Sequence, residues 1–253
     1  MTIAGAGSAT ITATFTPTDT GKFNTATTTY SVSVAKASQT ISFTSPGNQT
    51  YSASTISLTF SASSGLTPTV TSGDTSVCTV SGSTLTLVSS GSCALTATQA
   101  GNANYEAATS VTRTITVSKA STTLSGFANV SKTFGDVDFT VTAPTASVAG
   151  AITYSSSDAT VASVSGTTID VGNAGTATIT ATLAPTDSGK YNSTTTTMTI
   201  TVAKATPTLG MFAAVTKTYG DSAFGLVAPT ASVAGSFGYS SSDSSVASVV
   251  GSI

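Results

Sequence analysis

The chain has 253 residues, of which 39% are hydrophobic and only 7% are charged, and its net charge is −2. So small a net charge provides no field for a polyelectrolyte, which argues against nucleic acid as a partner, and no apolar run is long enough for a membrane helix, so no membrane insertion is expected. Histidine is absent, which excludes histidine-dependent catalytic triads and metal sites.

An internal repeat organises the chain. An Ala/Ser-Lys-Ala tripeptide recurs around Lys36, Lys119 and Lys204, at intervals of 83 and 85 residues. A period of about 84 residues matches a small domain and is too long for a solenoid repeat. We expect these lysines at the ends of strands, either solvated or paired with a turn aspartate.

The period divides the chain into pieces. In chain order they are the back half of one repeat (1–37), a complete repeat (38–120), a second complete repeat (121–205) and the front half of another (206–253). When the end pieces are aligned to 121–205, Ile253 falls at Thr168 and Met1 falls at Ile169. The two end pieces would therefore join into one repeat without a gap.

The end pieces have two interpretations. The chain is a piece of a longer array cut at arbitrary points, or the tail piece of one molecule completes the head piece of the next by strand addition. Closure of one chain on itself is disfavoured, because two intact domains in a row would have to bend back sharply.

Alternation with a period of two predicts strands throughout, and no stretch shows sustained helical periodicity. Apolar residues alternate with threonine from Ala177 to Leu183 and from Met198 to Val202, for example. Turns rich in Gly, Pro and Asp separate about seven such strands in each repeat, which predicts an all-β fold of antiparallel β-sandwiches. The aromatic residues of the third piece are expected in core and corner packing: Phe127, Phe134, Phe139, Tyr154 and Tyr191.

Both cysteines occur in the same repeat. Alanines take their places elsewhere: Ala162 and Ala247 align with Cys78, and Ala9 and Ala177 align with Cys93. Both positions have inward parity, so we predict a buried disulfide between Cys78 and Cys93, with two free buried thiols as the alternative. Closing a loop of about 15 residues would stabilise the fold by roughly 3 kcal/mol, and the bond would indicate an oxidising compartment. A metal site or a catalytic cysteine is disfavoured without histidine.

The aspartates also recur, in three sets that each fall in a predicted turn. The sets are Asp74, Asp158 and Asp243; Asp136 and Asp221; and Asp19 and Asp187. We expect these side chains to bond nearby backbone amides. Calcium is the alternative, but it needs six to eight oxygens, and the pair Asp136 and Asp138 is not repeated in the next copy. No metal is predicted, and no cofactor, because the Gly-rich stretches lack the lysine and helix of a phosphate loop.

Several motifs of the chain combine into a family pattern. They are YSSSDATVASVSG (154–166), GTATITAT (175–182), TVAKA (201–205) and KTYGD (217–221). Together they resemble the bacterial immunoglobulin-like repeats, of the Big type, found in large surface proteins, and residues 77–108 are similar to the cysteine-bearing version. The resemblance covers the whole chain and implies tandem immunoglobulin-like sandwiches in an elongated array. Piece 1–37 is then the C-terminal half of such a repeat, and piece 206–253 is the N-terminal half of another.

The resemblance implies a non-catalytic structural stalk or spacer of an exported bacterial surface protein, which projects a distal adhesive module. It places the chain outside the cell, with neighbouring repeats as partners and a glycan or host protein engaged by other parts of the parent. Two other functions stay open: a repeated glycan- or host-protein-binding module, and a phage tail or decoration domain. The near identity of the loops at 16–23 and 184–191 argues against a specific binder. We expect no enzymatic activity.

Overall fold

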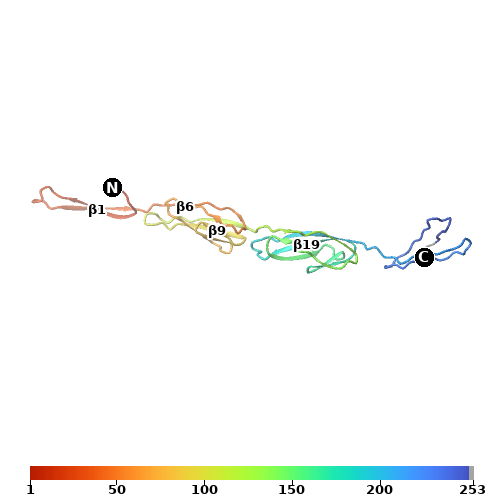
Figure 1. Cartoon of the computed structure of the whole chain (residues 1–253). Coiled ribbons are helices and arrows are strands. Elements are labelled where there is room, and N and C mark those ends of the chain that lie inside the picture. Colours follow the sequence, from red (N-terminus) through yellow and green to blue (C-terminus); the bar gives the residue numbers. More distant parts are fainter. Residues whose placement is uncertain (251–253) are drawn as a thin grey trace. The chain divides into compact units, whose positions relative to one another are not determined.

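The structure, a computed structural model, describes residues 1–250. Within this range the chain forms twenty strands and no helix (Figure 1). The prediction of an all-β protein is confirmed. The end of the predicted fourth piece, residues 251–253, lies outside the described residues.

The first two strands form a hairpin. β1 (Gly7–Phe15) pairs with β2 (Ala26–Val34) in antiparallel register, from Gly7 opposite Val34 to Phe15 opposite Ala26. Because successive side chains of a strand point to opposite faces, the apolar residues of β1 share one face and its threonines share the other.

Residues 41–118 form nine strands: β3 (Ile41–Phe43), β4 (Gln49–Thr50), β5 (Ile56–Ser57), β6 (Phe60–Ala62), β7 (Thr69–Ser72), β8 (Cys78–Ser81), β9 (Thr84–Leu87), β10 (Gly91–Thr98) and β11 (Val111–Ser118). One sheet has the order β4-β11-β10-β7, a second has the order β5-β9-β8, and β3 pairs with β6. With β3 and β4 as the first strand and β5 and β6 as the second, this is the strand order of an immunoglobulin-like sandwich. The fold class expected from the sequence is confirmed for this region.

One pairing differs from the expected antiparallel sheets. β4 pairs with β11 in parallel, with Gln49 opposite Val117. Pro46 and Gly47, which has a φ of +73°, separate β3 from β4. Proline has no N–H to continue a ladder and glycine tolerates positive φ, so the first strand breaks here and its second part runs beside β11.

The next nine strands repeat this order. They are β12 (Leu124–Ser125), β13 (Val130–Thr133), β14 (Phe139–Thr140), β15 (Thr145–Ala146), β16 (Gly150–Ser156), β17 (Ala162–Ser165), β18 (Thr168–Val171), β19 (Gly175–Pro185) and β20 (Thr194–Ala203). The sheets are β13-β20-β19-β16, β14-β18-β17 and β12-β15, and β13 again runs parallel to β20. Every strand thus has its counterpart nine strands earlier, although the two regions differ in sequence.

The described chain divides into two compact units. The first comprises residues 1–127, 143–153 and 181–196, and the second comprises residues 128–142, 154–180 and those from 197 onward. Strands β16, β19 and β20 each contribute residues to both units. This division does not test the repeat boundaries expected from the sequence, which remain a prediction.

The core of the first unit is mainly aliphatic. Its buried cluster draws on both sheets of residues 41–118: Phe43, Leu58, Val70, Val77, Cys78, Leu85, Leu87, Cys93, Leu95, Ala97, Ile115 and Val117. Alternation along β10 buries Cys93, Leu95 and Ala97 in succession. At about 25 cal/mol per Å² of apolar surface removed from water, such a row of buried side chains is what stabilises the sandwich.

The second unit is also built on small and branched aliphatic residues. Its buried apolar side chains are Val141, Val161, Ala162, Ile169, Ala177, Ile179, Met198, Ile200 and Val202. None of the aromatic residues expected in core and corner packing is fully buried: Phe127, Phe139, Tyr154 and Tyr191 are half-buried, and Phe134 is 54% exposed. The prediction for Phe134 is wrong because this residue follows β13 directly and lies in the turn that Asp136 closes.

Candidate functional site: a disulfide beside a repeated aspartate turn

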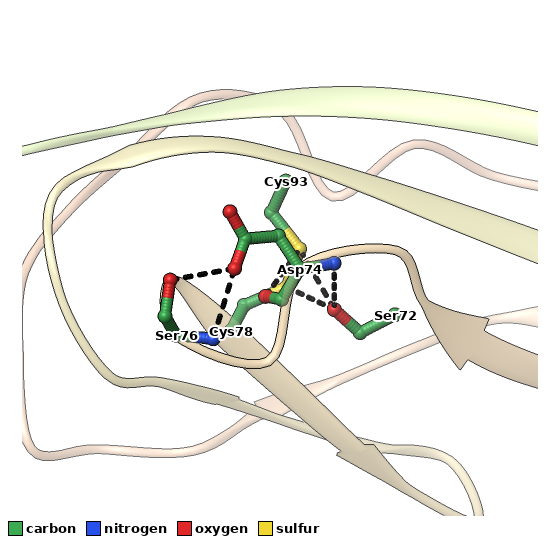
Figure 2. Close-up of a disulfide and its surroundings, with 5 residues drawn as sticks. All are labelled: Ser72, Asp74, Ser76, Cys78 and Cys93. Atoms are coloured by element: carbon green, nitrogen blue, oxygen red, sulfur yellow. Dashed lines mark hydrogen bonds between the residues drawn. A yellow bond between two sulfur atoms is a disulfide. The ribbon is translucent and has the colours of Figure 1, made fainter.

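The disulfide lies between the two sheets of residues 41–118. Cys78 begins β8 and pairs with Leu87 of β9, whereas Cys93 lies in β10 opposite Ile115. Both cysteines are fully buried, their Cα atoms are 6.2 Å apart, and their sulfur atoms are bonded (Figure 2). The bond therefore ties the sheet β5-β9-β8 to the sheet β4-β11-β10-β7 through the core.

A glycine sets the approach of the strand that carries Cys93. Gly91, the first residue of β10, has a φ of +148°, and a Cβ placed there would lie 2.8 Å from Cγ2 of Val77. The counterpart in β19, Gly175, would bring a Cβ to 2.7 Å from Cγ2 of Val161. Only glycine combines this backbone conformation with so little space for a side chain. In each repeat the strand therefore begins in contact with a valine, Val77 or Val161, which directly precedes the first cysteine position.

The end of β7 contacts the disulfide. Ser72 Oγ lies 3.2 Å from Cys93 Sγ and 3.5 Å from Cys78 Sγ, and it accepts a hydrogen bond of 3.2 Å from the Asp74 amide (Figure 2). The half-buried serine thus connects the turn after β7 to the bond between the sheets.

Asp74 builds the turn between β7 and β8. Its Oδ1 accepts hydrogen bonds from the Ser76 amide at 2.9 Å and the Ser76 hydroxyl at 2.6 Å (Figure 2), and its carbonyl accepts from the Cys78 amide at 3.0 Å. A carboxylate that bonds the backbone two residues on forms an Asx turn. The turn leads directly into β8, whose first residue is Cys78.

The same turn is built three times. Asp158 Oδ1 accepts from the amide and hydroxyl of Thr160 at 2.9 and 2.7 Å, and Asp243 Oδ1 accepts from the amide and hydroxyl of Ser245 at 2.9 and 2.6 Å. In each copy the aspartate amide also donates to the hydroxyl of the serine two residues earlier. The interpretation of this set as turn-forming residues is confirmed.

The hydroxyl partners of these aspartates were not predicted. Their signal is nevertheless present in the sequence, because a serine stands two residues before each aspartate and a serine or threonine stands two residues after it. Hydroxyl side chains compete well for backbone groups at turns, so a motif of the form Ser-x-Asp-x-Ser/Thr would have identified the whole network.

These hydrogen bonds predict a dependence of stability on pH. They lower the pKa of Asp74, Asp158 and Asp243 below the ordinary 3.8, mainly through the hydroxyl two residues on and next through the amide of that residue. A carboxyl group whose folded-state pKa lies below its unfolded value adds stability above the unfolded pKa, and this stability is lost as the pH falls through the folded pKa. We therefore expect urea unfolding midpoints to fall below about pH 4.

The matched variant for this test is Asp158→Asn. Its amide oxygen still accepts hydrogen bonds from Thr160, so the turn is kept while the titrating group is lost. We expect the variant to unfold at a urea midpoint that falls less steeply than that of the wild type between about pH 4 and pH 2. Identical pH profiles for the two proteins would contradict the role given to this carboxylate.

The other aspartates also bond locally. Asp136 accepts from the Thr133 amide at 2.8 Å, and Asp221 accepts from the Thr218 amide at 3.0 Å. Asp138, the second member of the sequence pair considered for calcium, accepts from a backbone amide of β18 at 3.0 Å. Across residues 1–250, no group of three His, Cys, Asp or Glu side chains is placed to hold a metal ion.

The three lysines that recur with the repeat, Lys36, Lys119 and Lys204, are exposed. The ion pairs recorded among residues 1–250 involve other lysines, and they join Lys22 to Asp19 and Lys190 to Asp187, each at 3.3 Å. The Lys22–Asp19 pair is largely solvent-exposed and contributes only about 0–1 kcal/mol. In the other pair the Lys190 side chain is 32% exposed, and its ammonium group also lies over the Tyr51 ring.

Two asparagines have a repeated structural role that the sequence did not reveal. Asn48 Oδ1 accepts a hydrogen bond from the Thr116 amide at 2.9 Å, and Asn129 Oδ1 accepts from the Thr199 amide at 2.8 Å. Each asparagine lies just before the strand that pairs in parallel with the last strand. Its side chain therefore accepts a hydrogen bond from a backbone amide just before the short parallel ladder begins.

Known proteins give the chain no family. No protein-family model matches it, and no curated protein matches it. Solved structures similar to it include Drosophila N-cadherin (12% identity, 67% of this chain and 69% of that chain, TM-score 0.27) and the Sidekick-1 immunoglobulin domains (14%, 79% and 46%, 0.30). A further one is the surface layer protein SbsC, domains 1–6 (14%, 82% and 37%, 0.26). The chain spans less than half the length of the Sidekick-1 and SbsC structures, and its fold assignment rests on its own strand order.

Taken together, the groups of the candidate site stabilise the fold. Its sulfur atoms are bonded to each other, and its carboxylates and hydroxyls are bonded to their own turns. In residues 1–250 there is also no helix of the length and apolar character needed to cross a membrane.

Proposed function

We propose that the chain is a non-catalytic structural spacer of an exported surface protein, built from bacterial immunoglobulin-like repeats of the Big type, that projects a distal adhesive module. The observation that carries the proposal is the duplicated strand order, in which β12–β20 repeat β3–β11 pair for pair. A scaffold that is copied whole adds length without adding a new site, and fold alone would not specify a ligand.

The use of the polar side chains supports this proposal. The aspartates of all three repeated turns, the serines before them and two asparagines bond backbone groups of the same region. Side chains that are committed to turns in several copies are scaffold residues, whereas a specific binding site would have polar groups free to meet a ligand.

The disulfide supports an extracellular location. Structural disulfides persist in oxidising compartments and are rare in the cytosol. Cys78 and Cys93 are both fully buried, and their bond joins two sheets. A buried cross-link of this kind suits a protein that is exported and must resist unfolding outside the cell.

Hydrogen bonds next to Lys36 and Lys119 support the proposal that neighbouring repeats of the chain contact each other. Ala37 bridges in parallel to Tyr105, and Ala120 bridges in parallel to Tyr191. The Ala37 amide donates to a carbonyl at 2.8 Å and its carbonyl accepts an amide at 2.9 Å, and Ala120 makes the same two bonds with the same lengths. The residues after Lys36 and Lys119 are thus each attached to the loop before the last strand of the following piece.

Pulling on single molecules of the full chain tests the spacer function. We expect discrete unfolding steps, because a spacer made of sandwiches yields one cooperative unit at a time. The bond between Cys78 and Cys93 withholds 15 residues, so the step that contains it is expected to lengthen by about 50 Å when reductant is added. Extension without steps would contradict the proposal.

Binding measurements on the full chain separate the spacer from the rival binding module. We expect no saturable binding on glycan arrays or to host cells, because the aspartates and serines of the repeated turns already bond within their own turns. Saturable binding at micromolar concentration would favour the binding module instead.

A further inference from the structure

Two loops of the chain each contact a short segment that lies far earlier in the sequence, and both contacts fall within the first compact unit. The loop 101–105 contacts residues 5–6, and the loop 187–191 contacts residues 89–90. We call these contacts the first and the second joint. The two segments are equivalent, because Gly5 and Ser89 each stand four residues before the second cysteine position of the repeat.

The two loops are equivalent as well. In each loop one carbonyl accepts, at 2.8 Å, the amide of the alanine that follows a repeated lysine: the carbonyl of Asn104 in the first joint and that of Lys190 in the second. The residues just before them, Ala103 and Gly189, therefore occupy the same place in the two loops.

In the second joint, a glycine of the loop faces a side chain of the segment. The Gly189 carbonyl accepts hydrogen bonds from the Ser90 amide at 2.8 Å and from the Ser89 hydroxyl at 3.2 Å. A Cβ placed on Gly189 would lie 2.5 Å from Ser89 Oγ. The loop approaches this closely because glycine has no side chain, and the alanine of the other loop, Ala103, would collide with a serine here.

Aromatic contacts reinforce the second joint. The rings of Tyr51 and Tyr191 meet edge to face with their centroids 5.6 Å apart, and Lys190 Nζ lies 5.6 Å from the centre of the Tyr51 ring. The same Nζ is held by Asp187 at 3.3 Å. The other loop has Asn104 in place of this lysine, so it carries no cation to place over a ring.

In the first joint, the glycine and the side chain change sides. Asn104 Oδ1 accepts a hydrogen bond of 3.0 Å from the Ala6 amide, and a Cβ placed on Gly5 would lie 2.9 Å from this oxygen. Ser89, the residue equivalent to Gly5, would therefore collide with Asn104 if the two met. Each joint thus combines a glycine on one side with a side chain on the other, and neither loop fits the segment of the other joint.

We propose that these joints are mutually exclusive recognition contacts that specify which repeat follows which. The segment 89–90 accepts a following repeat whose loop reads Gly-Lys-Tyr, and the segment 5–6 accepts one whose loop reads Ala-Asn-Tyr. A repeat of the 38–120 kind is then followed by one of the 121–205 kind, because its own loop would place a side chain against Ser89. The proposal rests on the spacer function, in which neighbouring repeats are the partners, and adds that the joints encode the order of the repeats.

Hydrogen exchange of single amides, measured by NMR on the full chain, tests this specificity. The Ser90 amide is the reporter, because its bond to Gly189 requires a closed second joint. Gly189→Ala/Lys190→Asn gives the second loop the residues of the first, and we expect the Ser90 amide to exchange about tenfold faster. Gly21→Ala/Lys22→Asn is the matched control. It makes the same changes in a loop with the same internal bonds, and it should leave the exchange of the Ser90 amide unchanged.

A compensating change separates recognition from simple damage to the loop. Adding Ser89→Gly and Ser90→Ala to the loop variant recreates the residue pairs of the first joint at the second. The amide at position 90 should then exchange nearly as slowly as in the wild type, because an asparagine side chain at position 190 can accept it as Asn104 accepts the Ala6 amide. Amides inside β10 should exchange at the wild-type rate in every variant.

Three results would overturn the proposal. The first is a loop variant whose Ser90 amide exchanges as in the wild type, and the second is a compensating change that fails to slow the exchange again. The third is faster exchange inside β10 together with Ser90, which would mean that the sandwich opens and not the joint. None of these results bears on the spacer function, which the unfolding steps under force test separately.

Discussion

The double variant Cys78→Ala/Cys93→Ala is expected to lower the free energy of unfolding of the region 38–120 by about 3 kcal/mol, since a cross-link that closes a loop of this length restricts the unfolded chain by that amount. For a unit of this size the change corresponds to a drop of about 12–24 °C in Tm. Alanine is the appropriate replacement, because Ala162 and Ala177 fill the same positions in the other copy and are fully buried there.

The measurement is hydrogen exchange of the full chain under increasing denaturant, read on peptides from residues 85–97. Peptides around Ile179 in β19 serve as the internal reference, because that strand contains no cysteine. Adding reductant to the wild type should reproduce the effect of the double variant. Equal protection of residues 85–97 with and without the bond would contradict the stabilising role, and two free thiols found by mass spectrometry without reductant would contradict the bond itself.

Leu95→Ala is expected to destabilise the same region by about 2–5 kcal/mol, because it removes a fully buried side chain and leaves a cavity between the sheets. Leu95 is 0% exposed and pairs with Arg113 across β10 and β11. The chain provides a matched comparison at the same strand position, since Ile11 is 42% exposed in β1. In a dilute solution, Ile11→Ala should change the unfolding free energy by less than about 1 kcal/mol.

Urea unfolding of both variants at low protein concentration makes this comparison. If the two truncations destabilise the chain equally, the result contradicts the claim that Leu95 in β10 is buried whereas Ile11 in β1 is exposed.

Much of the fold could be predicted from residue patterns. The alternation from Ala177 to Leu183 predicts a strand with one buried face, and those apolar residues are indeed buried in β19. The parallel pairs β4–β11 and β13–β20 could not be predicted, because a strand of two to four residues has no periodicity to identify its partner. The exposure of Phe134 was missed for a related reason, since its position in a turn outweighs its apolar character.

The candidate site was predicted in part. The disulfide could be predicted, with two free thiols as the alternative, because both cysteine positions have inward parity and alanines fill them in the other repeats, and the Asp74 turn followed from its repetition. The contact of Ser72 with the disulfide could not be derived, because it depends on where the end of β7 lies relative to β10. That placement is a property of the packed sheets.

The sequence by itself revealed the repeat and predicted the strands, the turns and a pairing of the two cysteines, because each of these follows from periodicity or from bonds between residues close in the chain. Only the tertiary structure decided whether an apolar face is actually buried. Val161 and Val246 occupy the same position of nearly identical segments, and they are 6% and 83% exposed. The difference arises because the burial of a side chain depends on its packing against other strands, and a local sequence does not specify that packing.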